Sequence, residues 1–179
     1  MKLPKVEVKK ILYATDLSEN ARYAFAYAVS LADLYNASIT FIHVLPEVPD
    51  LLDKSVIGYI SEERWEEIKS QNVDEAREAL IGKRRDYLVI KDALQQFSEN
   101  VKENHEGNGF VTDDIIVARG NPVEKILKQA EEKNCDLIVM GTHGHGTLAD
   151  AMMGSTARRV LRRSTKPVLV VRLPKEEES

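Results

Sequence analysis

The amino-acid sequence predicts an α/β protein built on a doubly wound, five-stranded parallel sheet. Short apolar runs rich in β-branched residues alternate along the chain with segments whose apolar residues recur at helical spacing. Strand–helix–strand crossovers are right-handed and place their helices on the faces of a sheet, so this alternation predicts parallel strands covered on both faces. With 179 residues, 43% apolar and 30% charged, the chain suits a single domain over 1–179.

The first strand–helix–strand unit is marked by an apolar run and a well-capped helix. Residues 11–14 predict a strand buried on both faces. Ser18 is a favourable N-cap, and the apolar residues that follow it as far as Tyr35 keep the spacing of an amphipathic helix, with Asn36 at the exit. Residues 38–45 are apolar and β-branched and stop before a proline, which predicts the second strand.

Residues 51–109 form a long, charge-dense segment between the second and third strands. Their helical apolar spacing occurs in pieces, around Trp65 and Ile68 and again over 93–101, and predicts two helices with a break near Gly82. The segment is longer than one crossover helix requires, so we expect part of it to project from the core as a helical excursion. Trp65 and Ile68 are interpreted as core side chains rather than as a docking surface.

Three strands and two helices complete the pattern. Residues 114–118 predict the third strand, and the Asn-Pro pair at 121–122 supplies a cap and a first-turn proline for the next helix. Apolar runs at 136–141 and 167–171 predict the last two strands, with a short helix over 154–163 between them. In such sheets the ligand crevice lies beyond the carboxyl ends of the strands, where the strand order reverses.

Composition excludes several classes of function. Lys and Arg number 25 and Asp and Glu 29, and the net charge of -4 gives no general attraction to nucleic acid. We interpret Arg158, Arg159, Arg162 and Arg163 as a solvated face that favours nearby phosphates. Cys135 is the only cysteine, and we expect it to be a small buried residue. With no export signal and no apolar run near the length of about 20 residues that spans a bilayer, we expect a cytoplasmic protein without membrane or nucleic-acid partners.

The segment after the fourth strand carries the clearest binding signal. Gly141 and Gly144 permit a close approach of main chain to a ligand, and Gly154-Ser155-Thr156 opens a helix whose amides, dipole and hydroxyls suit a phosphate. The loop lacks the lysine that a P-loop requires, and it matches the dinucleotide fingerprint only loosely. His143 and His145 have no third clustered ligand, so we expect no metal site there.

The spacing Gly141-x2-Gly144-x9-Gly154-Ser155 resembles the ATP-binding signature of the universal stress protein family. Residues 11–21 and 166–171 extend the resemblance, which covers 8–46 and 111–172. It implies an adenine nucleotide α-hydrolase-like, Rossmann-like fold and ATP, carried with Mg²⁺, as the ligand. It also implies a homodimer joined through the last strand, by Val168, Leu169, Val170 and Val171.

The resemblance further implies a set of nucleotide-site residues. Adenine and ribose would lie against the end of the first strand and the backbone of Val44, and the phosphates against the start of the last helix. The implied residues are Ala14, Thr15, Asp16, Val44, Met140, Gly141, Thr142, His143, Gly144, Gly154, Ser155 and Thr156. His145 stands where the family often carries a basic residue, and no role is implied for 51–109.

These observations favour an ATP-binding module for stress response or signalling, with an unidentified protein partner. The sequence offers no nucleophile–base pair, no paired carboxylates and no P-loop lysine. We therefore expect no catalytic residues and at most slow ATP hydrolysis or autophosphorylation, at Ser155 or Thr156. Two alternatives stay open: an enzyme of the same fold group that adenylates a substrate held by 51–109, and a nucleotide-free dimeric scaffold whose glycines only form a tight turn.

Overall fold

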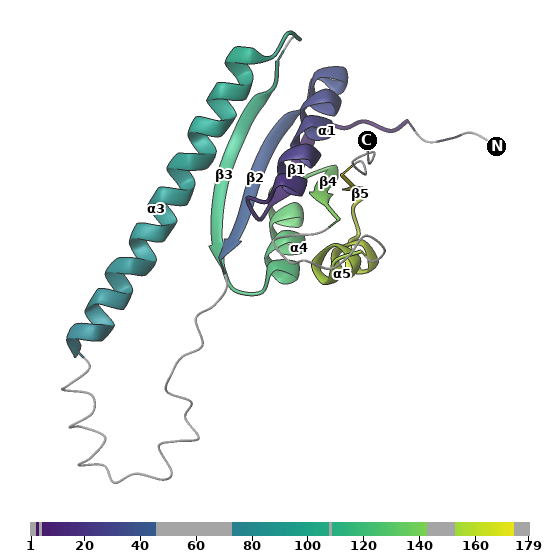
Figure 1. Cartoon of the computed structure of the whole chain (residues 1–179). Coiled ribbons are helices and arrows are strands. Elements are labelled where there is room, and N and C mark those ends of the chain that lie inside the picture. The colour runs from purple at the N-terminus through teal and green to yellow at the C-terminus, as the bar shows by residue number, and fades with distance from the viewer. Residues whose placement is uncertain (1–2, 4, 46–72, 108, 143–152, 174–179) are drawn as a thin grey trace, which may run out of the picture.

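The computed structural model describes residues 3, 5–45, 73–107, 109–142 and 153–173 of the chain. Five parallel strands form one sheet in the order β3-β2-β1-β4-β5, with β3 and β5 at its two edges (Figure 1). The predicted fold class is therefore confirmed. The strands are β1 (Lys10–Thr15), β2 (Ser38–Leu45), β3 (Val111–Arg119), β4 (Leu137–Gly141) and β5 (Val168–Val171).

Helices cover both faces of the sheet, and each face has its own apolar core. On one face, α1 (Glu19–Tyr35) and the C-terminal half of α3 (Val73–Asn104) bury side chains such as Phe25 and Leu94. On the other, α4 (Pro122–Glu132) and α5 (Ser155–Arg163) bury Ile126 and Val160. Successive strand residues point to opposite faces, which explains why Ile11 and Tyr13 belong to the first core but Leu12 and Ala14 to the second.

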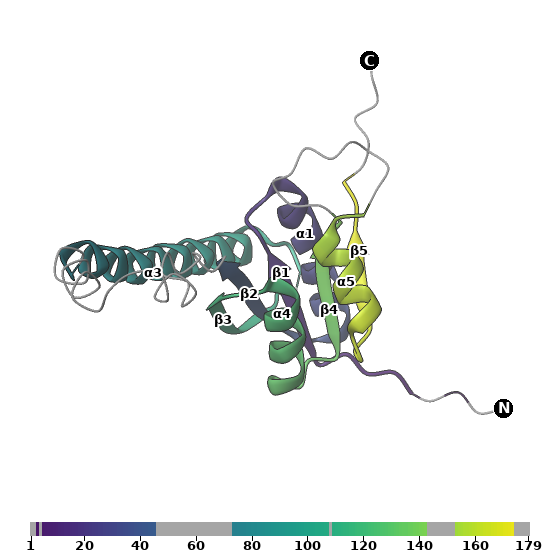
Figure 2. The ribbon, with the colours of Figure 1, turned by 90° about the horizontal axis from the view of Figure 1, so that it is seen from below.

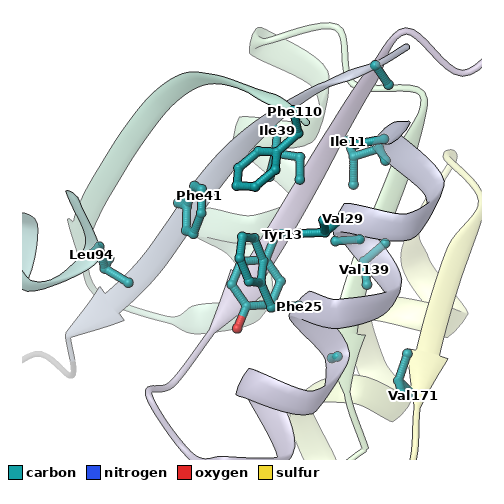
Figure 3. Close-up of a cluster of buried hydrophobic side chains, with 14 of the residues drawn as sticks. Ile11, Tyr13, Phe25, Val29, Ile39, Phe41, Leu94, Phe110, Val139 and Val171 are labelled. Carbon is teal, nitrogen blue, oxygen red and sulfur yellow. The ribbon is translucent and has the colours of Figure 1, made fainter. Parts of the chain in front are cut away.

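Phe25 lies at the centre of the first core (Figure 3). Its ring centroid is 4.8 Å from that of Tyr13, 5.0 Å from Phe41, 5.1 Å from Phe97 and 5.6 Å from Phe110. These rings belong to β1, β2, α3 and the residue before β3. One aromatic side chain of α1 therefore joins β1, β2 and the residue before β3 to the long helix.

The predicted helix ends agree with the structure. The side chain of Ser18 accepts a hydrogen bond from the amide of Ala21, and Asn36 ends α1 in the left-handed conformation with φ of 53°. Asn121 caps α4 by accepting from the amide of Glu124 at 3.2 Å, with Pro122 in the first turn. Capping side chains satisfy amides that the helix itself leaves unpaired, which is why these residue types could be read from the sequence.

The helical excursion is confirmed, but the break predicted near Gly82 is wrong. α3 runs without interruption for 32 residues, and a glycine in a helix costs only about 1 kcal/mol, too little to end a long helix of good helix formers. The helix stands out from the rest of the fold (Figure 2). Among the described residues, no helix, α3 included, is long and apolar enough to cross a membrane. Trp65 and Ile68 lie outside the described residues.

β3 begins at Val111, three residues before its predicted start at Asp114. A register shift opposite Ile39 and Thr40 gives β3 one extra residue there, Asp113. The irregularity places Asp113 beside Lys10, with the carboxylate 2.9 Å from the ammonium nitrogen. Asp113 also accepts a hydrogen bond of 3.0 Å from the hydroxyl of buried Thr40.

This contact predicts a pH dependence of stability. Lys10 holds the pKa of Asp113 below its ordinary value of 3.8. A lowered native pKa stabilises the fold above the unfolded-state pKa, and the stabilisation is lost as the pH falls through the native pKa. We therefore expect Asp113→Asn to lower the melting temperature at pH 7, and the difference from the parent protein to shrink as the pH falls through 3.8 and to vanish only below the lowered native pKa.

Melting curves between pH 7 and acid pH would measure that difference. Asp92→Asn removes an exposed carboxylate on α3 and serves as the matched control. A difference for Asp113→Asn that stays constant across this range would refute the electrostatic explanation.

Candidate functional site

A pocket of about 290 Å³ opens at the carboxyl ends of β1 and β4. The chain leaves β1 toward β2 on one side, through α1, and leaves β4 toward β5 on the other side, through α5. The strand order therefore reverses between β1 and β4, and the helices that follow them lie on opposite faces. This divergence leaves the crevice in which ligands of such sheets bind.

The inner part of the pocket is an apolar slot. Ala14 pairs across the sheet with Ile42 on one side and Met140 on the other, so the three side chains form a row over β2, β1 and β4. Ile126 of α4 also lines the pocket, and Pro122, at the start of that helix, contributes no amide hydrogen. A flat, apolar-faced ring is the kind of group that fits between such a row and a facing aliphatic side chain.

The turn between β1 and α1 supplies the polar rim. One carboxylate oxygen of Asp16 accepts hydrogen bonds from the amide of Ser18, at 3.1 Å, and from its hydroxyl, at 2.5 Å. The hydroxyl of Thr15 accepts from the amide of Leu17 at 3.0 Å. Leu17 has φ of 68°, a left-handed conformation uncommon for leucine, and the tight turn so formed fixes the half-buried carboxylate at the pocket.

The first turn of α5 forms the opposite end of the pocket. Gly154 is the N-cap residue, and because it has no side chain it makes no side-chain cap. α5 also carries no acidic residue in its first turn, whereas α1 and α4 each carry one. The amides and hydroxyls of Ser155 and Thr156, together with the positive end of the helix dipole, are thus available to an anion at the pocket.

Two backbone contacts position this turn. The amide of Gly154 donates to the carbonyl of Thr142 at 2.8 Å, and the amide of Thr142 donates to the carbonyl of Val171 at 2.9 Å. The side-chain amide of buried Asn20 donates to the hydroxyl of Thr142 at 3.1 Å. A Cβ at Gly141 would lie 3.2 Å from atoms of Asn20, so this glycine is what lets α1 approach β4 so closely.

The structure brings together ten of the twelve site residues implied by the sequence. They are Ala14, Thr15, Asp16, Val44, Met140, Gly141, Thr142, Gly154, Ser155 and Thr156. The other two, His143 and Gly144, lie outside the described residues, as does His145. Within the part of the chain that the structure describes, no three His, Cys, Asp or Glu side chains gather in a way that could hold a metal ion.

Five lining residues were missed by the sequence analysis: Ala21, Ile42, Pro122, Ile126 and Ala157. Ile42 lies two residues before Val44 and therefore on the same face of β2, which was a usable signal. The sequence does not reveal that α4 packs at this point of the sheet.

Cys135 is buried, as predicted, and burial raises the pKa of its thiol to about 11. The thiol is therefore protonated at neutral pH, the form in which it is a poor nucleophile and metal ligand.

Comparisons with known proteins agree on one family. The model of the universal stress protein family matches residues 7–172. The chain is similar to the universal stress protein MJ0577 of Methanocaldococcus jannaschii, with 33% identity over 175 residues that cover 93% of this chain and 96% of that protein. It is also similar to the universal stress protein YxiE of Bacillus subtilis, with 34% identity over 164 residues, 91% of this chain and 98% of that protein.

Solved structures give the same result. The structure of MJ0577 matches with a TM-score of 0.57 and 30% identity, covering 96% of this chain and 100% of that one. A universal stress protein from Archaeoglobus fulgidus, solved in complex with dAMP, matches with a TM-score of 0.52, covering 93% of this chain and 98% of that one. Its identity is 20%, so this second likeness concerns the fold alone.

Proposed function

Because this chain belongs to the universal stress protein family, we propose that it is a nucleotide-binding module of the stress response whose ligand is ATP. The observation that carries the proposal is a single pocket that joins an apolar slot to an uncapped helix start. The slot suits a purine ring, and the helix start suits phosphates. The A. fulgidus fold neighbour was solved with dAMP, so this fold can hold an adenine nucleotide.

Each part of the pocket has a role in this proposal. The base lies between the row formed by Ala14, Ile42 and Met140 and the side chain of Ile126, with its edge toward the backbone of Val44. The carboxylate of Asp16 accepts hydrogen bonds from ribose hydroxyls.

The phosphates lie against the amides of α5 and the hydroxyls of Ser155 and Thr156. Mg²⁺ accompanies them and keeps most of its water ligands, since Asp16 is the only carboxylate among the described residues that line the pocket.

Fast phosphoryl transfer is not part of the proposal. Among the described residues that line the pocket there is no lysine or arginine, and Asp16, the one carboxylate among them, is held in the cap of α1 through Ser18. Rapid transfer requires a cation against the terminal phosphate and a base against the attacking group. The protein acts by binding, and any transfer to Ser155 or Thr156 is slow.

Calorimetric titration of the purified protein with ATP, ADP and AMP in the presence of Mg²⁺ tests this function. Ile126→Trp fills the slot with an indole ring and is expected to weaken ATP binding at least about 100-fold. Leu161→Trp introduces the same ring at an exposed position of α5, where the side chain is 47% exposed, and should bind normally. No heat of binding for the parent protein, free of any co-purified nucleotide, would instead favour the nucleotide-free scaffold.

A homodimer formed through β5 belongs to the same proposal. The carbonyls of Pro167 and Val171 accept hydrogen bonds from Ile138 and Thr142. Because alternate residues of a parallel strand bond to the same neighbour, the backbone groups of Val168 and Val170 point to the open edge of the sheet. A second copy of β5 pairs with them.

Val170→Pro removes one amide donor from that edge and leaves in place the hydrogen bonds that the carbonyls of Pro167 and Val171 accept from Ile138 and Thr142. Sedimentation equilibrium is expected to show a dimer for the parent protein and a monomer for this variant, with unchanged far-ultraviolet circular dichroism. A parent protein that sediments as a monomer would contradict the proposed dimer.

The cytoplasmic location stays a prediction from the single-cysteine composition.

A further inference from the structure

His43 is a buried histidine of β2 to which the proposed function gives no role. Its side chain is 8% exposed, and it does not line the pocket. Side chains alternate along a strand, and the two residues before His43 show which way it points. Ile42 lines the pocket, whereas Phe41 belongs to the first core. His43 therefore lies on the face of the sheet that α1 and α3 cover, away from the pocket.

The ring of His43 is bonded to the end of β1. Its Nδ1 atom lies 2.9 Å from the carbonyl oxygen of Thr15, the residue that pairs with His43 across the two strands. A carbonyl oxygen can only accept a hydrogen bond, so Nδ1 carries the hydrogen and donates it. Thr15 is the last residue of β1, and a buried carbonyl at the end of a strand needs a partner beyond the regular ladder.

This bond fixes the direction in which the chain leaves the sheet. The carbonyl of Thr15 and the amide of Asp16 belong to one planar peptide unit, so a bond to the carbonyl also orients the amide. Leu17 follows with φ of 68°, and strained backbone of this kind persists only where surrounding contacts hold it. The bonds that the side chains of Thr15 and Asp16 accept from Leu17 and Ser18 join residues two apart, whereas the bond from His43 joins the turn to another strand.

The same bond links two sides of the pocket. The carboxylate of Asp16 lies on the β1 side and Val44 on the β2 side. Thr15 directly precedes Asp16 in the chain, and His43 directly precedes Val44. A bond between the two preceding residues therefore sets the separation of the groups to which the proposed function assigns the ribose and the base.

We propose that His43 is a positioning residue of the nucleotide site. It donates from Nδ1 to the carbonyl of Thr15 and so holds the carboxylate of Asp16 in register with the backbone of Val44. The effect on nucleotide affinity rests on the proposed function, whereas the effect on the turn is present without a ligand. Because these groups serve the base and the ribose, loss of the bond weakens AMP and ATP binding by the same factor.

Hydrogen exchange of the ligand-free protein tests the effect on the turn. His43→Leu removes the donor, whereas the side-chain amide introduced by His43→Asn can donate from nearly the position of Nδ1. The amides of Leu17 and Ser18 bond to side chains of the turn. In the His43→Leu variant they are expected to exchange at least about fivefold faster than in the parent protein, and His43→Asn should restore the parent rates.

The amide of Glu124 is the matched control, because it bonds to the side chain of Asn121 in the cap of another helix, α4. Its exchange rate should be the same in all three proteins. Unchanged rates for Leu17 and Ser18 in the His43→Leu variant would overturn the proposal. Faster exchange that His43→Asn does not reverse would also overturn it, since lost packing would then be the cause. Nitrogen NMR that places the ring hydrogen of His43 on Nε2 alone would have the same consequence.

Calorimetric titration measures the effect on the site. His43→Leu should weaken the binding of AMP and of ATP by the same factor of about 5–10, and His43→Asn should restore both affinities. Phe41→Leu is the control for stability, because Phe41 is buried on the same face of the same strand. It should lower the melting temperature and leave both affinities unchanged.

The outcomes separate the positioning role from the proposed function. Equal weakening by Phe41→Leu and His43→Leu, or a loss confined to ATP, would overturn the role of His43 in binding. A parent protein that binds neither nucleotide would refute the proposed function, and the exchange rates of Leu17 and Ser18 would still decide whether His43 holds the turn.

Discussion

Gly154→Asp is expected to raise the melting temperature of the ligand-free protein and to abolish its stabilisation by ATP. Gly154 is the N-cap of α5, with φ of −55° and ψ of 152°, and no side chain caps the helix. This extended conformation is open to any residue. An aspartate N-cap improves on glycine by only about a few tenths of a kcal/mol, and its carboxylate at the positive end of the helix dipole adds about 0.3–1 kcal/mol, so the variant should gain about 1 kcal/mol in free energy of unfolding. The same carboxylate would occupy the end of the pocket that we assign to the phosphates and would repel them.

Thermal melting with and without Mg-ATP measures both effects in one experiment. At 100 times the dissociation constant, a ligand adds about 2.7 kcal/mol to the stability of the parent protein. For a chain of this length that corresponds to roughly 5–10 °C, at about 2–4 °C per kcal/mol. The aspartate variant should lose this shift while melting about 2–4 °C higher without ligand.

Gly154→Asn separates the charge from the cap. Asparagine caps a helix as well as aspartate does but carries no charge, so this variant should show a smaller rise in the ligand-free melting temperature and keep most of the ATP shift. If Gly154→Asp retained the full shift, the phosphates would not lie at α5. If both variants lost it, the cause would be steric rather than electrostatic.

The sequence predicted the fold well because the structural signals in this chain are local. The strand at 38–45 and the helix from Ser18 to Asn36 coincide with β2 and α1, since an apolar run, a capping hydroxyl and a left-handed asparagine each act within a few residues. The end of β1 and the start of α5 were assigned to the site by the resemblance to the universal stress protein family, which rests on motifs that are also read along the chain. Such features need no knowledge of how the elements pack.

The errors and omissions concern packing. Nothing near Gly82 in the sequence states that α3 continues through it, because helix continuity is a sum of small propensities. Ile126 enters the pocket because α4 packs against β2 and β3, and Asn20 approaches Gly141 because α1 packs closely on β4. These contacts join residues about 80 to 120 positions apart, so no local pattern carries them.

Phe25→Ala is expected to reduce the free energy of unfolding by about 3–5 kcal/mol. Phe25 is 2% exposed and its ring meets four other aromatic rings in the first core. Alanine would leave a cavity enclosed by β1, β2, α3 and the start of β3. Edge-to-face and tilted ring contacts, each worth about 0.5–1.5 kcal/mol, would be lost together.

Urea denaturation followed by circular dichroism measures this change. If the fold is retained, the urea concentration at the unfolding midpoint falls, while the slope of the unfolding free energy against urea concentration stays constant. Domains of this size are stable by about 5–15 kcal/mol, so Phe25→Leu, which leaves a smaller cavity, keeps the test valid if the alanine variant does not fold. Leu34→Ala, at a position of α1 that is 75% exposed, should change stability by no more than about 0.5 kcal/mol. Equal effects of Phe25→Ala and Leu34→Ala would show that the aromatic cluster does not hold α1 on the sheet. Because α3 contacts α1 through Phe97, other contacts would then have to hold α3 in place.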